Sequence, residues 1–104
     1  MSEVETAGSG ADEPAGAAQR TVTICNKRGL HARAAARFVK LAWQFDAEVT
    51  VRKNGTTVSG RSIMGLMMLA AGPGTTIELA ATGREAERAV AALADLVTGG
   101  FDEG

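Results

Sequence analysis

Several short segments of the chain alternate between apolar and polar residues, which is the pattern of a strand with one buried face. This alternation occurs in residues 21–25, 47–52 and 76–80. Asn54-Gly55 follows the second segment, and this dipeptide favours the two-residue type I′ turn of a β-hairpin. The pattern therefore predicts one more strand directly after Gly55, antiparallel to the strand before the turn.

Three other segments carry apolar residues at the spacing of an amphipathic helix. The first covers residues 32–44, with basic side chains on its polar face. The second covers residues 62–69, and Ser62 is the expected N-cap. The third follows residues 82–85, which have the form of a capping box, and ends at the glycine pair 99–100.

The predicted order of the elements is β-α-β-β-α-β-α. Because each strand has one apolar and one polar face, the sheet needs a cover on one side only. We expect an α+β fold, an open-faced β-sandwich in which three helices cover one side of a four-stranded antiparallel sheet. Residues 20–104 are predicted to form this single domain. Residues 1–19 have no periodic apolar pattern and are predicted to be a disordered acidic tail.

Charge is distributed unevenly along the chain. The 104 residues carry a net charge of −1, but residues 20–61 hold nine Lys or Arg against two carboxylates, and both flanking parts are acidic. This basic part favours an anionic ligand or an acidic protein partner. Nucleic acid is the other partner class for a basic surface. We do not expect it, because the four aromatic residues do not alternate with the basic ones as a stacking surface requires.

Several other classes of protein are not expected from this sequence. No apolar run approaches the roughly 20 residues of a membrane span, and the N-terminus lacks the layout of a signal peptide, so we expect a cytoplasmic protein without membrane attachment. Cys25 is the only cysteine and cannot form an internal disulfide. One histidine and one cysteine make a poor metal site, and no hydrolytic triad is recognisable. A monomer is the default at this length.

His31 is the only histidine, and it immediately precedes the predicted helix at 32–44. Free backbone N–H groups and the positive end of the helix dipole favour negative charge there. A neutral imidazole in this place keeps one ring nitrogen with a free lone pair, which can attack phosphorus. Arg33 would contact the phosphoryl oxygens, and Gly29 would let the loop approach closely. The alternative is that His31 has no catalytic role and is merely a residue that the start of a helix tolerates.

Two motifs resemble those of a known family. Residues 29–33, Gly-Leu-His-Ala-Arg, resemble the active-site segment of the HPr family of phosphotransferase-system carriers, and so do the residues that follow: Ala35, Ala36, Phe38, Val39 and Lys40. Residues 62–69 resemble the family's helix that carries a regulatory serine. The resemblance covers residues 20–104, and its ending, residues 100–103, resembles the nitrogen-regulatory branch, often called NPr.

The resemblance implies a phosphocarrier that accepts a phosphoryl group from enzyme I, itself charged by phosphoenolpyruvate, and passes it to an EIIA-type protein. His31 would carry the group on Nδ1 as pros-phosphohistidine, although the residues alone do not choose between Nδ1 and Nε2. Arg33 would stabilise the phosphate, and Gly29 and Leu30 would support the loop. Such a chain is a transfer component rather than a free-standing enzyme, and it needs no cofactor. Ala34 stands where the family commonly has proline, and we expect little effect on the chemistry.

The predicted second helix has two further candidate roles. If its leucines point into the core, helical spacing turns Ile63, Met64 and Met67 outward, and these residues would form a docking surface for a partner. The alternative is that the methionines fill the core. Ser62 is expected to cap the helix whatever else it does. The resemblance also implies its phosphorylation by HPr kinase/phosphorylase, which would oppose the docking of an acidic partner.

A different class of function also fits these features. The chain would then be a regulatory protein-binding module, whose basic face and methionine patch control a partner independently of phosphoryl transfer. The two interpretations make different demands on His31. Replacement by alanine would abolish a relay and leave pure binding intact. The residues leave open whether the acceptor belongs to sugar uptake or to nitrogen regulation.

Overall fold

The computed structural model describes residues 16–103 of the chain. Its elements follow the predicted order of strands and helices, with one short 3-10 helix added at the end. In chain order they are β2 (Ala17–Thr23), α1 (Ala32–Ala42), β3 (Glu48–Lys53), β4 (Thr56–Ser59), α2 (Ile63–Met68), β5 (Thr76–Thr82), α3 (Ala86–Thr98) and η2 (Gly100–Asp102). Within the described range, no helix combines the length and apolar character that crossing a membrane requires.

The four strands form one sheet in the order β2-β5-β3-β4, and every neighbouring pair is antiparallel. Strand β5, the last strand in sequence, therefore lies between β2, the first strand, and β3, and it pairs with both. The hairpin between β3 and β4 turns at Asn54 and Gly55, whose φ angles of 50° and 84° are both positive. A type I′ turn requires such angles at both central positions, which confirms the predicted turn.

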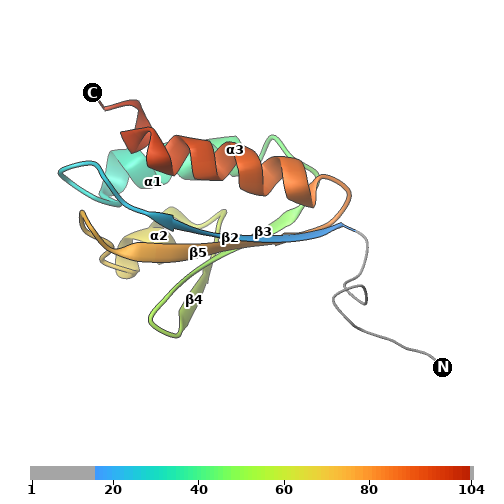
Figure 1. The fold of residues 1–104 in the computed structure, drawn as a ribbon, viewed down its shortest axis with the longest axis horizontal. Coiled ribbons are helices and arrows are strands. Elements are labelled where there is room, and N and C mark those ends of the chain that lie inside the picture. Colours follow the sequence, from blue (N-terminus) through green and yellow to red (C-terminus); the bar gives the residue numbers. More distant parts are fainter. Residues whose placement is uncertain (1–15, 104) are drawn as a thin grey trace.

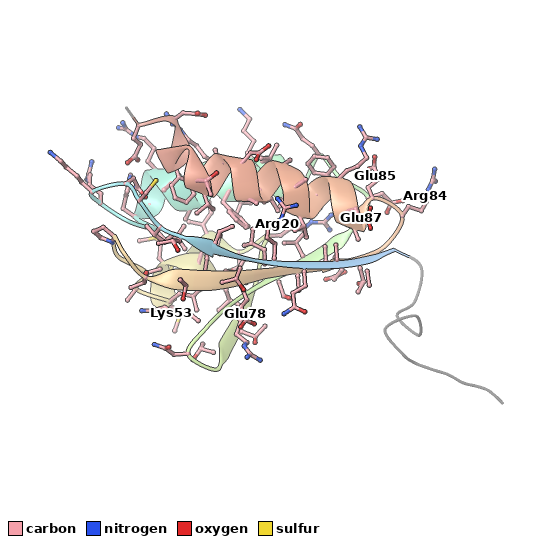
Figure 2. The ribbon with its side chains drawn as sticks, in the orientation of Figure 1. Arg20, Lys53, Glu78, Arg84, Glu85 and Glu87 are labelled. Atoms are coloured by element: carbon pink, nitrogen blue, oxygen red, sulfur yellow. The ribbon has the colours of Figure 1, made fainter. Side chains whose placement is uncertain are left out.

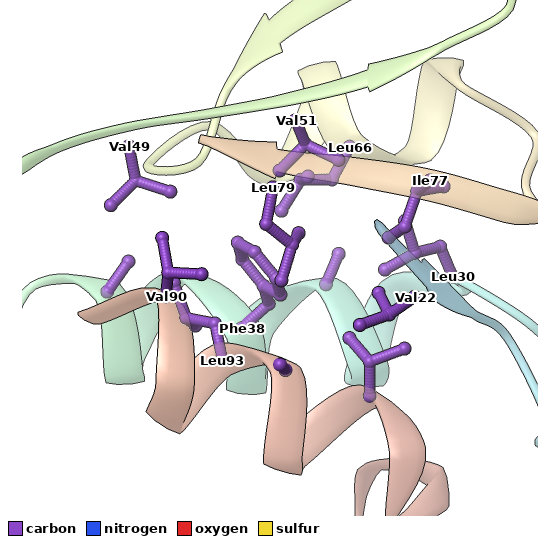
Figure 3. Close-up of a cluster of buried hydrophobic side chains, with 14 of the residues drawn as sticks. Val22, Leu30, Phe38, Val49, Val51, Leu66, Ile77, Leu79, Val90 and Leu93 are labelled. Carbon is purple, nitrogen blue, oxygen red and sulfur yellow. The ribbon is translucent and has the colours of Figure 1, made fainter. Parts of the chain in front are cut away.

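Helices α1 and α3 lie side by side across one face of the sheet (Figure 1). Helix α2 packs against α1 and β4. The core lies between these layers, where Phe38 of α1 and Leu93 of α3 point toward Val51 and Leu79 of the sheet, with Leu66 of α2 beside them (Figure 3). All five side chains are fully buried, and each contributes about 1.5–3 kcal/mol by leaving water. The predicted open-faced sandwich is confirmed.

The opposite face of the sheet carries polar side chains. Lys53 and Glu78 project from the sheet on the side away from α1 and α3, whereas Arg84, Glu85 and Glu87 gather near the start of α3 (Figure 2). Glu78 also pairs with Arg52 of the neighbouring strand, at 3.4 Å between Nε and Oε1. An exposed pair of this kind contributes little to stability. The alternation of apolar and polar residues along the strands thus separates a core face from a solvated face.

The first strand begins earlier than predicted. It spans Ala17–Thr23 rather than 21–25, because Ala17 pairs with Thr82 at the far end of β5. Backbone pairing orders residues 17–19 although they lack the apolar alternation on which the prediction relied. The predicted boundary of the tail at residue 19 is therefore wrong for these residues, and the remaining tail prediction, for residues 1–15, lies outside the described part of the chain.

The predicted capping box of the last helix is also wrong. Thr82 is the last residue of β5, and the N-cap of α3 is Glu85, whose side chain makes no capping hydrogen bond. Glu85 instead binds the loop before β3: its Oε1 accepts from the Asp46 N–H at 2.8 Å, and its own N–H donates to the Asp46 carbonyl at 3.0 Å. A long-range contact has replaced the local cap that the motif suggests.

Candidate functional site

His31 occupies the N-cap of α1, as predicted, with φ −75° and ψ 178°. Its carbonyl accepts from the Ala35 N–H at 2.8 Å, the first bond of the helix. Its ring turns back over the same turn, where Nδ1 accepts a hydrogen bond from the Arg33 backbone N–H at 3.2 Å. The side chain is 16% exposed. The imidazole is thus held against the helix N-terminus while an edge stays accessible.

The two ring nitrogens of His31 face opposite kinds of partner. Nδ1 faces an N–H donor, so it must carry a lone pair, whereas Nε2 faces the Glu103 carboxylate oxygen Oε2, so it must carry the proton. This pairing assigns the Nε2–H tautomer to the neutral ring. Nδ1 is therefore the nitrogen with an electron pair to offer, a choice that the residues alone left open.

Glu103 is a site residue that sequence reasoning missed. It follows the turn η2, which contains Phe101 with a positive φ of 56°. The Phe101 side chain is fully buried, and the Phe101 carbonyl accepts a hydrogen bond from the Arg37 guanidinium. Asn26, itself buried, donates from Nδ2 to Glu103 Oε1 at 3.0 Å and to the Gly29 carbonyl at 2.9 Å. The carboxylate is thus held from both the turn and the loop before His31.

The environment of Glu103 favours its charged form. The pKa of its carboxyl lies below the ordinary value of 4.5, first because of the hydrogen bond from Asn26 and then because of the one from His31. The positive charge of Arg28 acts in the same direction, and desolvation opposes these effects. An ionised carboxylate therefore faces Nε2 at neutral pH.

Gly29 and Leu30 brace the loop before His31 against the segment after α2. The Leu30 N–H donates to the Ala71 carbonyl at 2.9 Å, and the Leu30 side chain is buried in the core. Gly29 has a φ of 62°, and a Cβ atom on it would lie 2.3 Å from the same Ala71 oxygen. Only glycine fits this position, which explains how the loop brings His31 to the start of α1.

Basic side chains surround the site. An open pocket of about 850 Å³ lies beside the loop before His31 and is lined by Lys27 and Arg28 of that loop, by Arg33 and Arg37 of α1, and by Glu103. The predicted residue Arg33 therefore donates its backbone N–H to Nδ1 and also lines this pocket. Positive charge concentrated beside a nucleophile attracts anionic groups.

Helix α2 presents the apolar surface that the sequence predicts. Leu66 is fully buried, whereas Ile63, Met64 and Met67 are 41%, 70% and 40% exposed. Met68, which the prediction left out, is 77% exposed. Met67 also lines a shallow depression together with His31, so this surface reaches the histidine.

Ser62 caps α2 as predicted. Its Oγ accepts from the Gly65 N–H at 2.9 Å, and its backbone is extended, with φ −117° and ψ 110°. Gly65 is close-packed there, since a Cβ on it would lie 3.1 Å from both the Ser62 Oγ and the Val58 Cβ. The serine hydroxyl thus sits at the start of the same short helix that carries the exposed methionines.

Comparison with known proteins finds similarity over nearly the whole described domain. The family model described as "PTS HPr component phosphorylation site" matches residues 18–99. The phosphocarrier protein HPr of Neisseria meningitidis is 52% identical over 86 residues, which is 83% of this chain and 97% of the relative. The phosphocarrier protein NPr of Shewanella violacea is 48% identical over 85 residues, which is 82% of this chain and 93% of the relative.

The fold is also similar to solved structures. The crystal structure of HPr-C-His from Thermoanaerobacter tengcongensis aligns with a TM-score of 0.80 and 41% identity, covering 84% of this chain and 98% of the other. HPr from Bacillus anthracis aligns with a TM-score of 0.75 and 44% identity, covering 78% and 96%.

Proposed function

The chain belongs to the HPr family of phosphotransferase-system phosphocarriers, and on that premise we propose that Nδ1 of His31 accepts the phosphoryl group. The donor is enzyme I, and the acceptor is an EIIA-type protein of a sugar or nitrogen-regulatory system. Relatives named HPr and NPr match at similar identity, so both kinds of acceptor fit. The proposed role is that of a monomeric transfer component in the cytoplasm.

The observation that supports this proposal best is the hydrogen bond from the Arg33 N–H to Nδ1 at 3.2 Å. It marks Nδ1 as the nitrogen with the lone pair and places it at the helix N-terminus, where backbone N–H groups have no helical partner. A phosphoryl group on Nδ1 would lie against those N–H groups. The start of α1 would therefore supply both the nucleophile, from His31, and an anion site, from its free backbone N–H groups.

In the transfer step, the lone pair of Nδ1 forms a bond to phosphorus while the N–P bond of the donor phosphohistidine breaks. The pair of electrons from the broken bond returns to the donor nitrogen, so no metal-bound or acyl intermediate is needed. The Arg33 N–H, released from Nδ1, can donate to a phosphoryl oxygen. The Arg33 guanidinium adds a charge-assisted contact to the same group.

Docking in this proposal uses the surface formed by Ile63, Met64 and Met67, with the basic side chains of the site at its edge. Exposed apolar residues of this kind usually anchor a protein interface. The charge beside them fits partners with an acidic rim and speeds their encounter with the chain. Enzyme I and the EIIA-type acceptor would bind this one surface in turn, since each must reach the same nitrogen.

Phosphorylation of Ser62 is proposed as a regulatory step on the same surface. The hydroxyl lies at the start of α2, next to Ile63 and Met64, so a phosphate there would add about two negative charges beside the docking surface. A phosphate at a helix N-terminus is compatible with the fold. The expected effect is weaker docking of acidic partners, with HPr kinase/phosphorylase as the modifying enzyme.

Intact-mass analysis after incubation with enzyme I and phosphoenolpyruvate tests the proposed function, with samples kept at neutral or alkaline pH to preserve phosphohistidine. We expect one phosphoryl increment on the native chain and none on His31→Ala. A His31→Ala chain that is phosphorylated, or an unmodified native chain beside active enzyme I, would contradict the proposal. Binding without phosphorylation would instead favour a regulatory binding module.

A further inference from the structure

A groove follows the outer edge of β2 and ends at the basic pocket beside His31. Among the described strands, β2 pairs with β5 alone, so its other edge forms the border of the sheet. A hollow of about 450 Å³ lies between that edge and α3. Cys25 and Thr98 line both this hollow and the pocket of about 850 Å³ described above, so the two form one continuous groove.

The groove has an excess of positive charge along its length. The cations that line it are Arg20 of β2, Lys27 and Arg28 of the loop, and Arg33 and Arg37 of α1. The carboxylates that line it are Asp95, Asp102 and Glu103, and the last is already bound by Asn26 and His31. Arg20 projects from β2 toward α3 (Figure 2). Within residues 16–103, none of these cations forms an ion pair, so the groove suits an acidic stretch of chain.

Residues 1–15 directly precede β2 and carry the opposite charge. They contain four carboxylates, Glu3, Glu5, Asp12 and Glu13, and no Lys, Arg or His. The family model begins its match at residue 18, so this segment lies outside the part of the chain that matches the family. The acidic segment is therefore attached to the strand that borders the basic groove, and the two are complementary in charge.

The spacing of the charges along the chain also matches. Asp12 lies four residues before Gly16, and Arg20 lies four residues after it. Glu5 and Lys27 each lie eleven residues from Gly16, on opposite sides. Since both stretches can span about 3.3–3.6 Å per residue, a segment that reverses at Gly16 and follows β2 brings a carboxylate to a cation at both ends of the groove. Gly16 has a φ of 80°, a conformation suited to such a reversal.

We propose that residues 1–15 fold back along β2 and bind in this groove, where their carboxylates compete with acidic partners for the cations beside His31. Attachment to β2 keeps the segment at a local concentration of about millimolar, so weak exposed ion pairs are sufficient to populate the contact. The competition rests on the function proposed above, because it assumes partners that dock at this site. The binding of the segment to the groove does not depend on that function.

The test uses two variants of the full chain that remove equal charge at different distances from β2. The distal variant combines Glu3→Gln and Glu5→Gln, and the proximal variant combines Asp12→Asn and Glu13→Gln. At about 3.3–3.6 Å per residue, the proximal carboxylates can reach the start of the groove but not the pocket beside His31. The proximal variant is therefore the matched control for the distal one.

The first measurement compares backbone amide shifts by nuclear magnetic resonance, with no partner present. The distal variant should move the amides of Lys27 and Arg28 relative to the native chain, whereas the proximal variant should move the amide of Arg20. The amide of Glu78, whose side chain lies on the opposite face of the sheet, should stay unchanged in both. At about 1 M salt, where the Debye length is about 3 Å, the differences at the cations should disappear.

The second measurement is calorimetric titration with enzyme I at low ionic strength. The distal variant should bind about threefold more tightly than the native chain, the size of two weak exposed ion pairs. The proximal variant should stay closer to the native affinity. The gain in the distal variant should shrink as salt is added, because salt screens the contact that the substitution removes.

The outcomes separate this inference from the proposed function. Unmoved amides of Lys27 and Arg28 in the distal variant would overturn the contact, whatever enzyme I does. Shifts that grow with chain concentration would assign the groove to the segment of a second copy and overturn the fold-back. Amide shifts with native affinity for enzyme I would overturn the competition. Failure of enzyme I to bind any of the three chains would contradict the proposed function alone, because the amide shifts do not depend on it.

Discussion

The backbone N–H of Arg33 donates to Nδ1 of His31 at 3.2 Å, so the proposed nucleophile is already in the place where its product would be bound. The bond must break when Nδ1 attacks phosphorus, and the released N–H then faces the new phosphoryl oxygens. Little reorganisation is required, because both groups belong to the first turn of α1. In the proposed transfer, the start of α1 both holds the nucleophile and binds the transferred phosphoryl group.

Gly29→Ala should disturb the site through the loop. The new Cβ would lie 2.3 Å from the Ala71 oxygen at a φ of 62°, so we expect a loss of about 2–4 kcal/mol in the free energy of unfolding. Gly55→Ala is the matched control, since its φ is 84° but nothing lies within 4 Å of its Cβ. It should cost only about 1 kcal/mol. Equal losses in urea unfolding would show that the contact with Ala71 has no role.

Two variants of Ser62 separate the capping role of this residue from the effect of a negative charge at the same position. Ser62→Ala removes the acceptor for the Gly65 N–H and should cost about 1 kcal/mol in urea unfolding. Ser62→Asp keeps a capping oxygen, so its stability should stay close to that of the native chain, while its binding to enzyme I weakens because of the added negative charge. Native affinity in Ser62→Asp would argue against the proposed regulation.

Met64→Glu should weaken binding to enzyme I without unfolding the chain. The side chain is 70% exposed, so the change in unfolding free energy should stay within about 0.5 kcal/mol. Leu66→Ala on the same helix, which is fully buried, should instead cost about 2–5 kcal/mol. Calorimetric titration with enzyme I measures the binding. If Met64→Glu binds with native affinity, the docking surface lies elsewhere.

Stability should depend on acid pH through Glu103. Its pKa is lowered in the folded chain, so its contribution to stability is present above the unfolded value of 4.5 and is lost as the pH falls through the lower folded value. As the pH falls below 4.5 and through this lower value, the native chain should therefore lose its stability advantage over Glu103→Gln. Urea unfolding over a pH series measures this, with Asp102→Asn to control for the loss of one carboxylate from the turn. A constant difference across the series would contradict the assignment.

Local signals in the sequence predicted much of this structure. Asn54-Gly55 predicted the hairpin because both residues tolerate positive φ, and Ser62 predicted a cap because its hydroxyl reaches the backbone three residues on. Helical spacing predicted which face of α2 is exposed. Each of these depends on neighbours within a few residues.

The features that the sequence did not predict depend on contacts between residues that lie far apart in the chain. Glu103 reaches His31 only because Phe101 packs into the core and folds the C-terminal turn back onto α1. The buried Phe101 after the glycine pair is the one signal that could have indicated this turn. Glu85 likewise binds Asp46 instead of forming a local capping box. The residues next to Glu103 in the sequence do not indicate which residue its carboxylate will contact.

The most direct test of the proposed chemistry is nuclear magnetic resonance on the isotopically labelled chain after phosphorylation by enzyme I. We expect phosphorus coupling to Nδ1 of His31, a proton retained on Nε2, and a shift of the Arg33 amide larger than that of the Arg37 amide one turn on. Phosphorus on Nε2, or on any residue other than His31, would contradict the account.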